Sequence, residues 1–143
     1  MKADSFKIKL DLLHASMDPI EITEVFSIQP NFSWKAGSCA DKIVHKWTVW
    51  NGTLAEGKKG DDFDEALKKA LTVLEGRKDW LAKSFIEDGE LDVVFSFCTD
   101  LIEGIINEVE FYPELLERLT KLNAGIKFQV WMEDAEDTKI EDE

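Results

Sequence analysis

The sequence is poor in the residues from which many catalytic and metal sites are built. Its 143 residues include two cysteines, Cys39 and Cys98, and two histidines, His14 and His45. The cysteines lie far apart without a CxxC pair, and no cysteine or acid stands near either histidine at a metal-ligand spacing. We expect no metal or cofactor. We interpret His14 as a surface residue at a strand end and His45 as a sheet residue.

The motifs of several large enzyme classes are also missing. The chain contains no P-loop, no dinucleotide-binding glycine motif, no HExxH and no GxSxG elbow. Because the chain has 30 acidic residues, many pairs of carboxylates are possible, and no single pair identifies a catalytic site. The acids at 61, 62, 64 and 65 are best explained by the positive end of a following helix. We therefore expect a protein that is not an enzyme.

Positive charge and long hydrophobic runs are scarce as well. The chain has 17 Lys and Arg residues against 30 Asp and Glu, a net charge of −13 with a pI near 4.5. Such an excess of negative charge repels phosphate backbones and disfavours nucleic acid as a partner. The longest uncharged stretch with strand character, 93–99, is far shorter than the roughly 20 residues that span a bilayer. We find no signal-peptide pattern in the first 13 residues, and we expect a cytoplasmic protein with free thiols and no membrane partner.

Enough hydrophobic sequence remains, 44%, to build the core of one domain. Alternation of apolar and polar residues predicts strands, and apolar stripes three and four residues apart predict helices. Expected strands lie at 6–12, 43–50, 91–97, 105–111 and 126–130, and expected helices at 19–26, 62–75, 78–85 and 113–122, with a glycine- and lysine-rich turn at 52–60. This order predicts a ferredoxin-like α+β sandwich, with a mostly antiparallel sheet of about five strands and helices on one face.

The helix boundaries have local chemical signals. Asp18 can accept hydrogen bonds from the free N–H groups of the first helix, and Pro19 suits its first position. Asn123 and Gly125 tolerate the left-handed conformation at a helix end. Past residue 132 the pattern stops, because 133–143 contains seven acids against one lysine. We expect one domain at 1–132 and a disordered acidic tail at 133–143.

The most informative feature for function is a cluster of aromatic residues. Four of them fall within twenty residues, around a glycine-containing loop that also carries lysines: Phe32, Trp34, Trp47 and Trp50, with Lys35, Lys42 and Lys46. Rigid rings beside cations suit a binding surface or the wall of a pocket. We interpret Trp47 as a core residue. For Trp34 and Trp50 a structural role and a ligand contact both stay open, and the candidate binding residues are Trp34, Lys35, His45 and Trp50.

The order of several short motifs resembles a known bacterial family. These motifs are Ser5-Phe6-Lys7-Ile8, Asp18 to Thr23, Ile28-Gln29-Pro30, Lys35-Ala36-Gly37, Trp47-Thr48-Val49, and the later pieces 67–74 and 115–131. Together they resemble the family catalogued as domain of unknown function 4279, over most of the chain except the acidic tail. The resemblance implies a small bacterial α+β protein of unassigned function, with no catalytic residues to carry over.

Two functions fit these observations. The first is a non-catalytic binding domain for a protein or small molecule, with Trp34 and Trp50 in one pocket or apolar patch. The alternative is an acidic immunity or inhibitor protein that neutralises a basic partner such as a nuclease toxin, because opposite charge speeds association.

Overall fold

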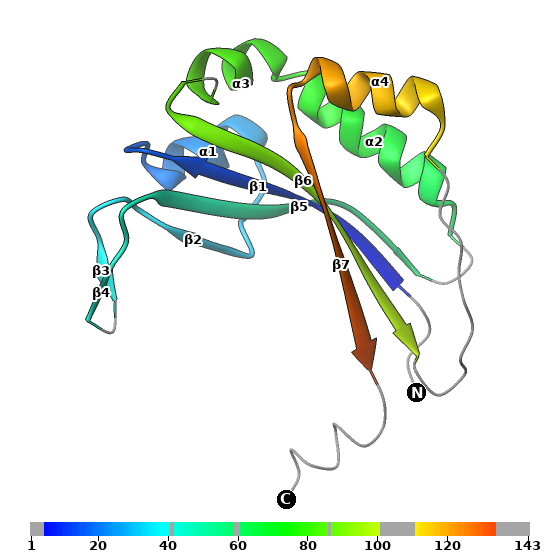
Figure 1. Ribbon diagram of the computed structural model, residues 1–143, viewed down its shortest axis with the longest axis horizontal. Coiled ribbons are helices and arrows are strands. Elements are labelled where there is room, and N and C mark those ends of the chain that lie inside the picture. The colour runs from blue at the N-terminus through cyan, green and yellow to red at the C-terminus, as the bar shows by residue number, and fades with distance from the viewer. Residues whose placement is uncertain (1–4, 41, 59–60, 86, 101–110, 134–143) are drawn as a thin grey trace, which may run out of the picture.

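A five-stranded sheet forms the centre of the molecule (Figure 1). The computed structural model describes residues 5–40, 42–58, 61–85, 87–100 and 111–133. The strand order is β2 (Phe32–Trp34), β5 (Thr48–Lys58), β1 (Ser5–His14), β6 (Gly89–Asp100) and β7 (Gly125–Glu133). All neighbours are antiparallel except β6 and β7. A two-stranded hairpin, β3 (Cys39–Ala40) and β4 (Ile43–Val44), stands beside this sheet.

Among the described residues, four helices cover one face of the sheet. They are α1 (Pro19–Phe26), α2 (Phe63–Glu75), α3 (Lys78–Phe85) and α4 (Pro113–Lys121), in agreement with the predicted helices. The α+β class and the mostly antiparallel sheet are thereby confirmed. The ferredoxin-like arrangement is not, because α4 connects β6 and β7 as direct parallel neighbours, whereas the split βαβ unit places another strand between such a pair.

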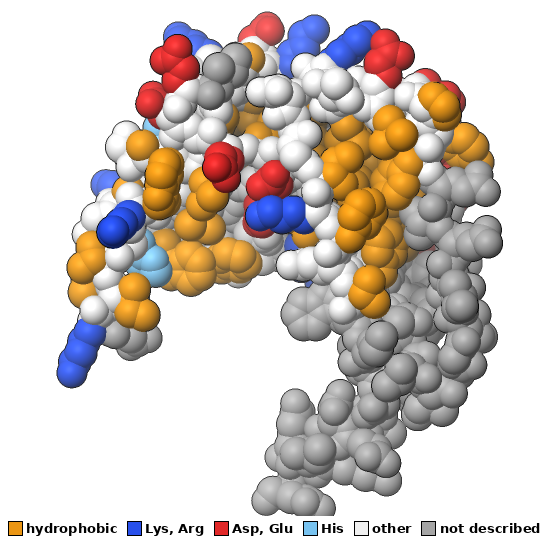
Figure 2. Space-filling view, viewed as in Figure 1, with side chains coloured by type: hydrophobic (Ala, Val, Ile, Leu, Met, Phe, Trp, Pro, Cys, Tyr) orange, Lys and Arg blue, Asp and Glu red, His pale blue; other side chains and the backbone are white. Residues whose placement is uncertain are grey.

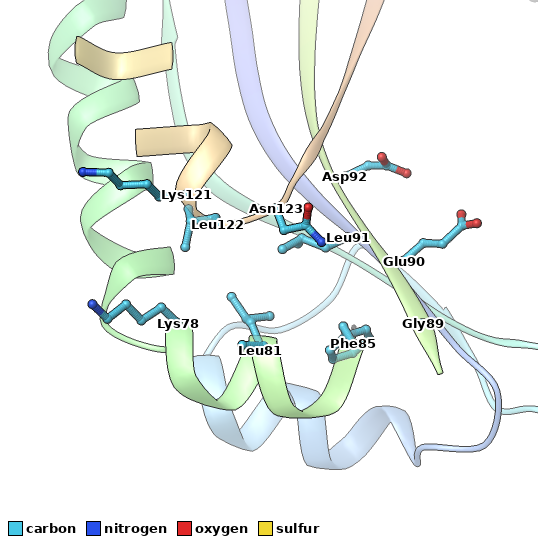
Figure 3. A pocket seen from close by; sticks show the side chains of 11 residues that line it. Lys78, Leu81, Phe85, Gly89, Glu90, Leu91, Asp92, Lys121, Leu122 and Asn123 are labelled. Carbon is cyan, nitrogen blue, oxygen red and sulfur yellow. The ribbon is translucent and has the colours of Figure 1, made fainter. Parts of the chain in front are cut away.

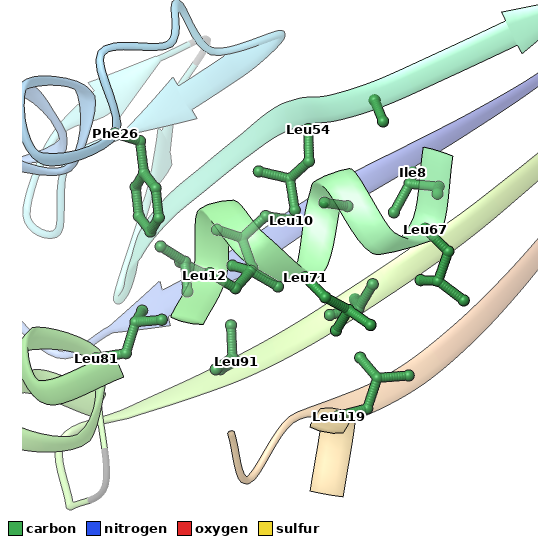
Figure 4. Packing of buried hydrophobic residues seen from close by; sticks show 14 of the residues in the cluster. Ile8, Leu10, Leu12, Phe26, Leu54, Leu67, Leu71, Leu81, Leu91 and Leu119 are labelled. Atoms are coloured by element: carbon green, nitrogen blue, oxygen red, sulfur yellow. The ribbon is translucent and has the colours of Figure 1, made fainter. Parts of the chain in front are cut away.

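The core lies between the sheet and the helices (Figure 4). Along β1 the even-numbered residues face the helices, and Ile8, Leu10 and Leu12 are at most 1% exposed. The apolar side chains on one face of β1 thus pack in the same layer as the apolar stripe of α2. The helices contribute Ile22 and Phe26 from α1, Leu67, Ala70, Leu71 and Leu74 from α2, Leu81 and Phe85 from α3, and Leu115 and Leu119 from α4.

The predicted helix caps are present. The Asp18 side chain accepts a hydrogen bond from the Ile20 N–H at 3.0 Å. Asp62 accepts from the N–H of Asp64 at 2.9 Å and of Glu65 at 3.4 Å, so this acid serves the start of α2.

The prediction of a strand at 43–50 followed by a turn at 52–60 is wrong. The chain instead forms the short β4, a connection at 45–47, and then β5 through Lys58. Gly52 and Gly57, which suggested a turn, lie in a strand, and a large ring covers each of them. A Cβ on Gly52 would approach the Trp50 ring to 2.3 Å, and one on Gly57 would approach the Phe6 ring to 2.3 Å.

Two expected segments fall largely outside the described residues. The predicted strand at 105–111 is one, since only Phe111 of it is described. The expected disordered tail is the other, although Glu133, its first residue, belongs to β7.

Candidate functional site

The face of the sheet opposite the helices is the first candidate surface. Because successive strand residues point to opposite faces, Lys9, Asp11 and Leu13 of β1 project away from the helices. In the part of the chain that the structure describes, no helix packs on this face, which we call the open face.

A row of polar side chains crosses the open face. Asp11 lies opposite Asn51 on β5 and opposite Asp92 on β6 in the strand register. Asn51 donates a side-chain hydrogen bond to Asp11, and Asn31 donates to the Asn51 Oδ1 at 2.8 Å. On the other side, the Lys127 Nζ lies 3.3 Å from Asp92 Oδ2 and 3.9 Å from Asp11 Oδ2. We call these five residues, which belong to the sheet or flank it, the polar row.

At the Asp92 end of the polar row, the backbone of β7 lies close to the side chain of Asp92 on β6. Gly125 is the register partner of Asp92, and a Cβ on Gly125 would lie 2.1 Å from Asp92 Oδ1. The Asp92 side chain is therefore only 19% exposed, whereas the Lys127 side chain is 52% exposed. Asp11 accepts a hydrogen bond from the side-chain amide of Asn51, and the ammonium group of Lys127 lies near both Asp11 and Asp92. The row is consequently a network of paired groups, without a nucleophile and its base in contact.

Exposed apolar side chains gather beside the polar row. Phe32 and Trp34 of β2 lie opposite Asn51 and Val49 in the register, so both rings project on the open face. The ring centroid of Trp34 lies 5.1 Å from that of Phe32 and 5.1 Å from that of His45, on which it stacks. We define the aromatic patch as these three rings with Ile43, Val44 and Trp47.

The side chains of the aromatic patch are open to solvent. Trp34 is 39% exposed, Phe32 44%, Trp47 49%, and Ile43 and Val44 62% each. Figure 2 shows hydrophobic side chains with a histidine and lysines over the region where Figure 1 places β2, β3 and β4. Clustered apolar exposure of this kind marks an interaction surface more often than single exposed residues do.

Backbone hydrogen bonds hold the rings in place. The Gly37 N–H donates to the His45 carbonyl at 2.7 Å, and the His45 N–H donates to the Ser38 carbonyl at 2.9 Å. The Ala36 N–H donates to the Thr48 Oγ1 at 3.0 Å. Gly37 has a φ of +86°, which favours glycine at this turn. The loop after β2 is thereby fixed against the connection from β4 to β5.

Three of the four candidate binding residues predicted from sequence lie in or beside the aromatic patch. Trp34 and His45 form its stacked pair. Lys35 directly follows Trp34, its side chain is 58% exposed, and its Nζ lies 3.6 Å from Asp18 Oδ2.

Trp50 lies elsewhere, and the expectation that it shares a surface with Trp34 is wrong. Its register partner is Leu12, so its ring faces the helices, where it is fully buried. The Trp50 Nε1 donates to the Thr23 Oγ1 at 3.0 Å, and the ring stacks on Phe26 at 5.8 Å. Trp34 and Trp50 therefore lie on opposite faces of the sheet.

Two further side chains differ from their predicted environments. Trp47, expected in the core, is 49% exposed because it lies in the connection between β4 and β5. His14, expected at the surface, is 9% exposed and packs edge-on against Phe85 at 5.3 Å. Its Nδ1 accepts hydrogen bonds from the N–H groups of Ser16 and Met17 at 3.0 and 2.9 Å, so it organises the chain after β1.

A cleft lies at the edge of the core (Figure 3). It holds about 510 Å³ between α3, the start of β6 and the segment after α4. Leu81, Leu91 and Leu122 point toward one another across it, while the carboxylates of Glu90 and Asp92 point away. Two lysines and an asparagine also line the cleft, so its wall is mixed rather than apolar.

Sequence reasoning missed the polar row. Asp11 was visible as a polar position in an alternating strand, but its contacts with Asn51 and Lys127 depend on strand order and register. In the described parts of the chain, no group of three or more His, Cys, Asp or Glu side chains could hold a metal ion. Over the same ranges, no helix has the length and apolar character to cross a membrane.

These features define the class of protein: an α+β domain with one sheet face buried under helices and an aromatic patch at the edge of the other. The chain belongs to the family described as a domain of unknown function (DUF4279), whose model matches residues 4–133. The resemblance in the sequence motifs is thereby confirmed. Neither the curated proteins nor the solved structures contain a match to the chain.

Proposed function

We propose that this protein is a non-catalytic binding domain that holds a partner against the aromatic patch. The observation that carries the proposal is the joint exposure of Phe32, Trp34, Ile43, Val44 and Trp47, each between 39% and 62%, on β2, β4 and the connection from β4 to β5. Tryptophan and other large rigid side chains supply much of the energy of protein interfaces when they are buried by a partner. A bacterial cytoplasmic location is part of this proposal, and the exposed thiol of Cys39 is in keeping with a reducing compartment.

The geometry supports binding rather than chemistry. The rings of Phe32 and His45 each contact the ring of Trp34, and the groups of the polar row are paired with one another. Such an arrangement offers a preformed surface that loses little side-chain entropy on association.

Binding to defined ligands tests the proposal. Tryptophan fluorescence of the full chain is titrated with a panel of metabolites and of twelve-residue peptides, and each response is repeated with Trp34→Ala. We expect at least one saturable ligand whose affinity falls by about tenfold or more in the variant, as for a central aromatic anchor. Leu116→Ala is the control, since Leu116 on α4 is also 39% exposed. If every ligand binds the wild type and Trp34→Ala with equal affinity, the aromatic patch is not the binding site.

The alternative proposal, an inhibitor of a basic protein, is supported by the net charge of −13. It requires an affinity that decreases as salt is added, because opposite charges are screened. Salt dependence therefore separates it from the proposal developed below.

A further inference from the structure

The chain segment that carries the aromatic patch has a positive net charge, and one acid from outside it, Asp18, lies beside Lys35, with its Oδ2 3.6 Å from the Lys35 Nζ. Residues 31–55 contain three lysines, Lys35, Lys42 and Lys46, against one acid, Asp41. This stretch carries a net +2 in a chain of −13, so the other residues carry −15. The aromatic patch of this acidic protein thus lies on a segment with a positive net charge.

The lysines surround the exposed apolar side chains. Lys35 follows Trp34, and the exposed Lys42 and Lys46 stand on either side of the segment that holds Ile43 and Val44. Ile43 and Val44 are successive strand residues, which point to opposite faces, and both are 62% exposed. Figure 1 shows this hairpin standing away from the helical layer. A partner can therefore contact apolar side chains and ammonium groups at the same time.

We propose that the partner of the aromatic patch is an acidic polypeptide segment that carries apolar side chains. This inference rests on the binding function proposed above and names its partner class. Apolar side chains of the segment would pack on Trp34, Ile43 and Trp47, and its carboxylates would pair with Lys35, Lys42 and Lys46 at the rim, which is the usual division between the centre and rim of an interface.

Other charged partners fit these contacts less well. A basic protein would place its charges against the three lysines. A nucleic acid would meet only three cations, and its phosphates would be repelled by the remaining −15.

The opposed charges predict an unusual salt dependence. At 0.01 M salt the Debye length is about 30 Å, so an acidic segment is repelled by the whole acidic body. At 0.15 M it is about 8 Å, so mainly the nearby lysines act on the segment. The affinity of an acidic segment should therefore increase from low to physiological salt, whereas that of a basic partner should decrease.

Selection from a displayed library of random twelve-residue peptides on the immobilised full chain tests the inference. The enriched peptides are synthesised, and their dissociation constants are measured by fluorescence anisotropy at 10 and 150 mM NaCl. We expect acidic peptides with large apolar residues that bind several-fold more tightly at 150 mM. The triple variant Lys35→Gln, Lys42→Gln, Lys46→Gln should weaken them by about tenfold. Its control is Lys69→Gln, Lys78→Gln, Lys83→Gln, which makes the same charge change at exposed lysines of α2 and α3.

The outcomes separate this inference from the proposed function. Basic peptides that need Trp34, or acidic peptides that bind the triple variant and its control equally, would overturn the acidic partner and leave the binding function standing. If no enriched peptide loses affinity in Trp34→Ala, both the acidic partner and the binding function of the aromatic patch are overturned. A dT20 oligonucleotide or phosphatidylserine vesicles that bind as tightly as the best peptide, and lose affinity in the triple variant, would overturn the inference in favour of that partner class.

Discussion

Strand β1 allows a direct comparison of the two faces of the sheet. On the helix side, Leu10 and Leu12 are almost completely removed from water. On the open face, Lys9 and Asp11 are only partly buried, and Asp11 is held by Asn51 and Lys127. Apolar burial contributes far more to folding than exposed ion pairs do. The helix side therefore stabilises the domain, and the open face and its edge can change for recognition at little cost in stability.

The largest effect should come from truncating the helix side of this strand. Leu12→Ala is expected to lower the free energy of unfolding by about 2–5 kcal/mol, because Leu12 is 1% exposed and its removal leaves a cavity in the core. Urea unfolding followed by circular dichroism measures the change. The neighbouring Asp11→Ala on the open face should cost about 1 kcal/mol or less. Equal losses in the two variants would contradict the division between the faces.

Overpacking the same side should have the next largest effect. In Gly52→Ala the new Cβ would lie 2.3 Å from Cη2 of Trp50, a ring that is fully buried, and we expect a loss of about 1–3 kcal/mol. Gly76→Ala is the matched control. The nearest atom to its Cβ is 3.4 Å away, and Gly76 has a helical φ of −64°, so that variant should be neutral or slightly stabilising. Thermal unfolding distinguishes the two, and a harmless Gly52→Ala would show that Trp50 can move.

A charged contact within the helical layer should matter less. Arg118 donates two hydrogen bonds to Glu75, at 2.8 and 2.6 Å, which join α4 to α2. The hydrogen bond from Arg118 lowers the pKa of Glu75 below its ordinary value of 4.5. Because the pKa is lower in the folded state, the stabilisation is present above the unfolded-state value and is lost as the pH falls through the folded-state value.

The variant Arg118→Gln measures this contribution. Both side chains are about one third exposed, so we expect a loss of at most about 1 kcal/mol at pH 7. The difference from the wild type should shrink as urea unfolding is repeated at decreasing pH below 4.5. A difference that is constant between pH 7 and pH 3 would show that the guanidinium acts through packing alone.

The smallest effect should come from the polar row. The Lys127 Nζ lies 3.3 Å from Asp92 Oδ2, and the Lys127 side chain is half exposed. A double-mutant cycle of Asp92→Asn and Lys127→Met should therefore give a coupling energy below about 1 kcal/mol. This coupling energy should decrease in 1 M NaCl because salt screens the two charges. A coupling of several kcal/mol would mean that the open face contributes to stability as much as the helix side.

Local patterns were sufficient for the helices. The cap at Asp18 and the apolar stripe of α2 act within a few residues, so all four helices could be predicted. The prediction was wrong where tertiary contacts overrode local chemistry. Gly52 and Gly57 usually favour turns, but here each lies beneath a large ring in a long strand. For the site, Trp34 was found because clustered aromatics are visible in sequence, whereas the face on which each ring lies depends on where β5 begins.

By itself the sequence determined the class of the domain, its helices and its opposed charges, because periodicity, capping and charge are properties of short segments. The tertiary structure decided which tryptophan is exposed and which polar groups meet. A shift of one residue in a strand moves every side chain to the other face, and the start of β5 at Thr48 places Trp50 in the core while Trp47 stays in solvent. Similarly, Asp11 and Lys127 are far apart in the chain and come together only because β1 and β7 both flank β6.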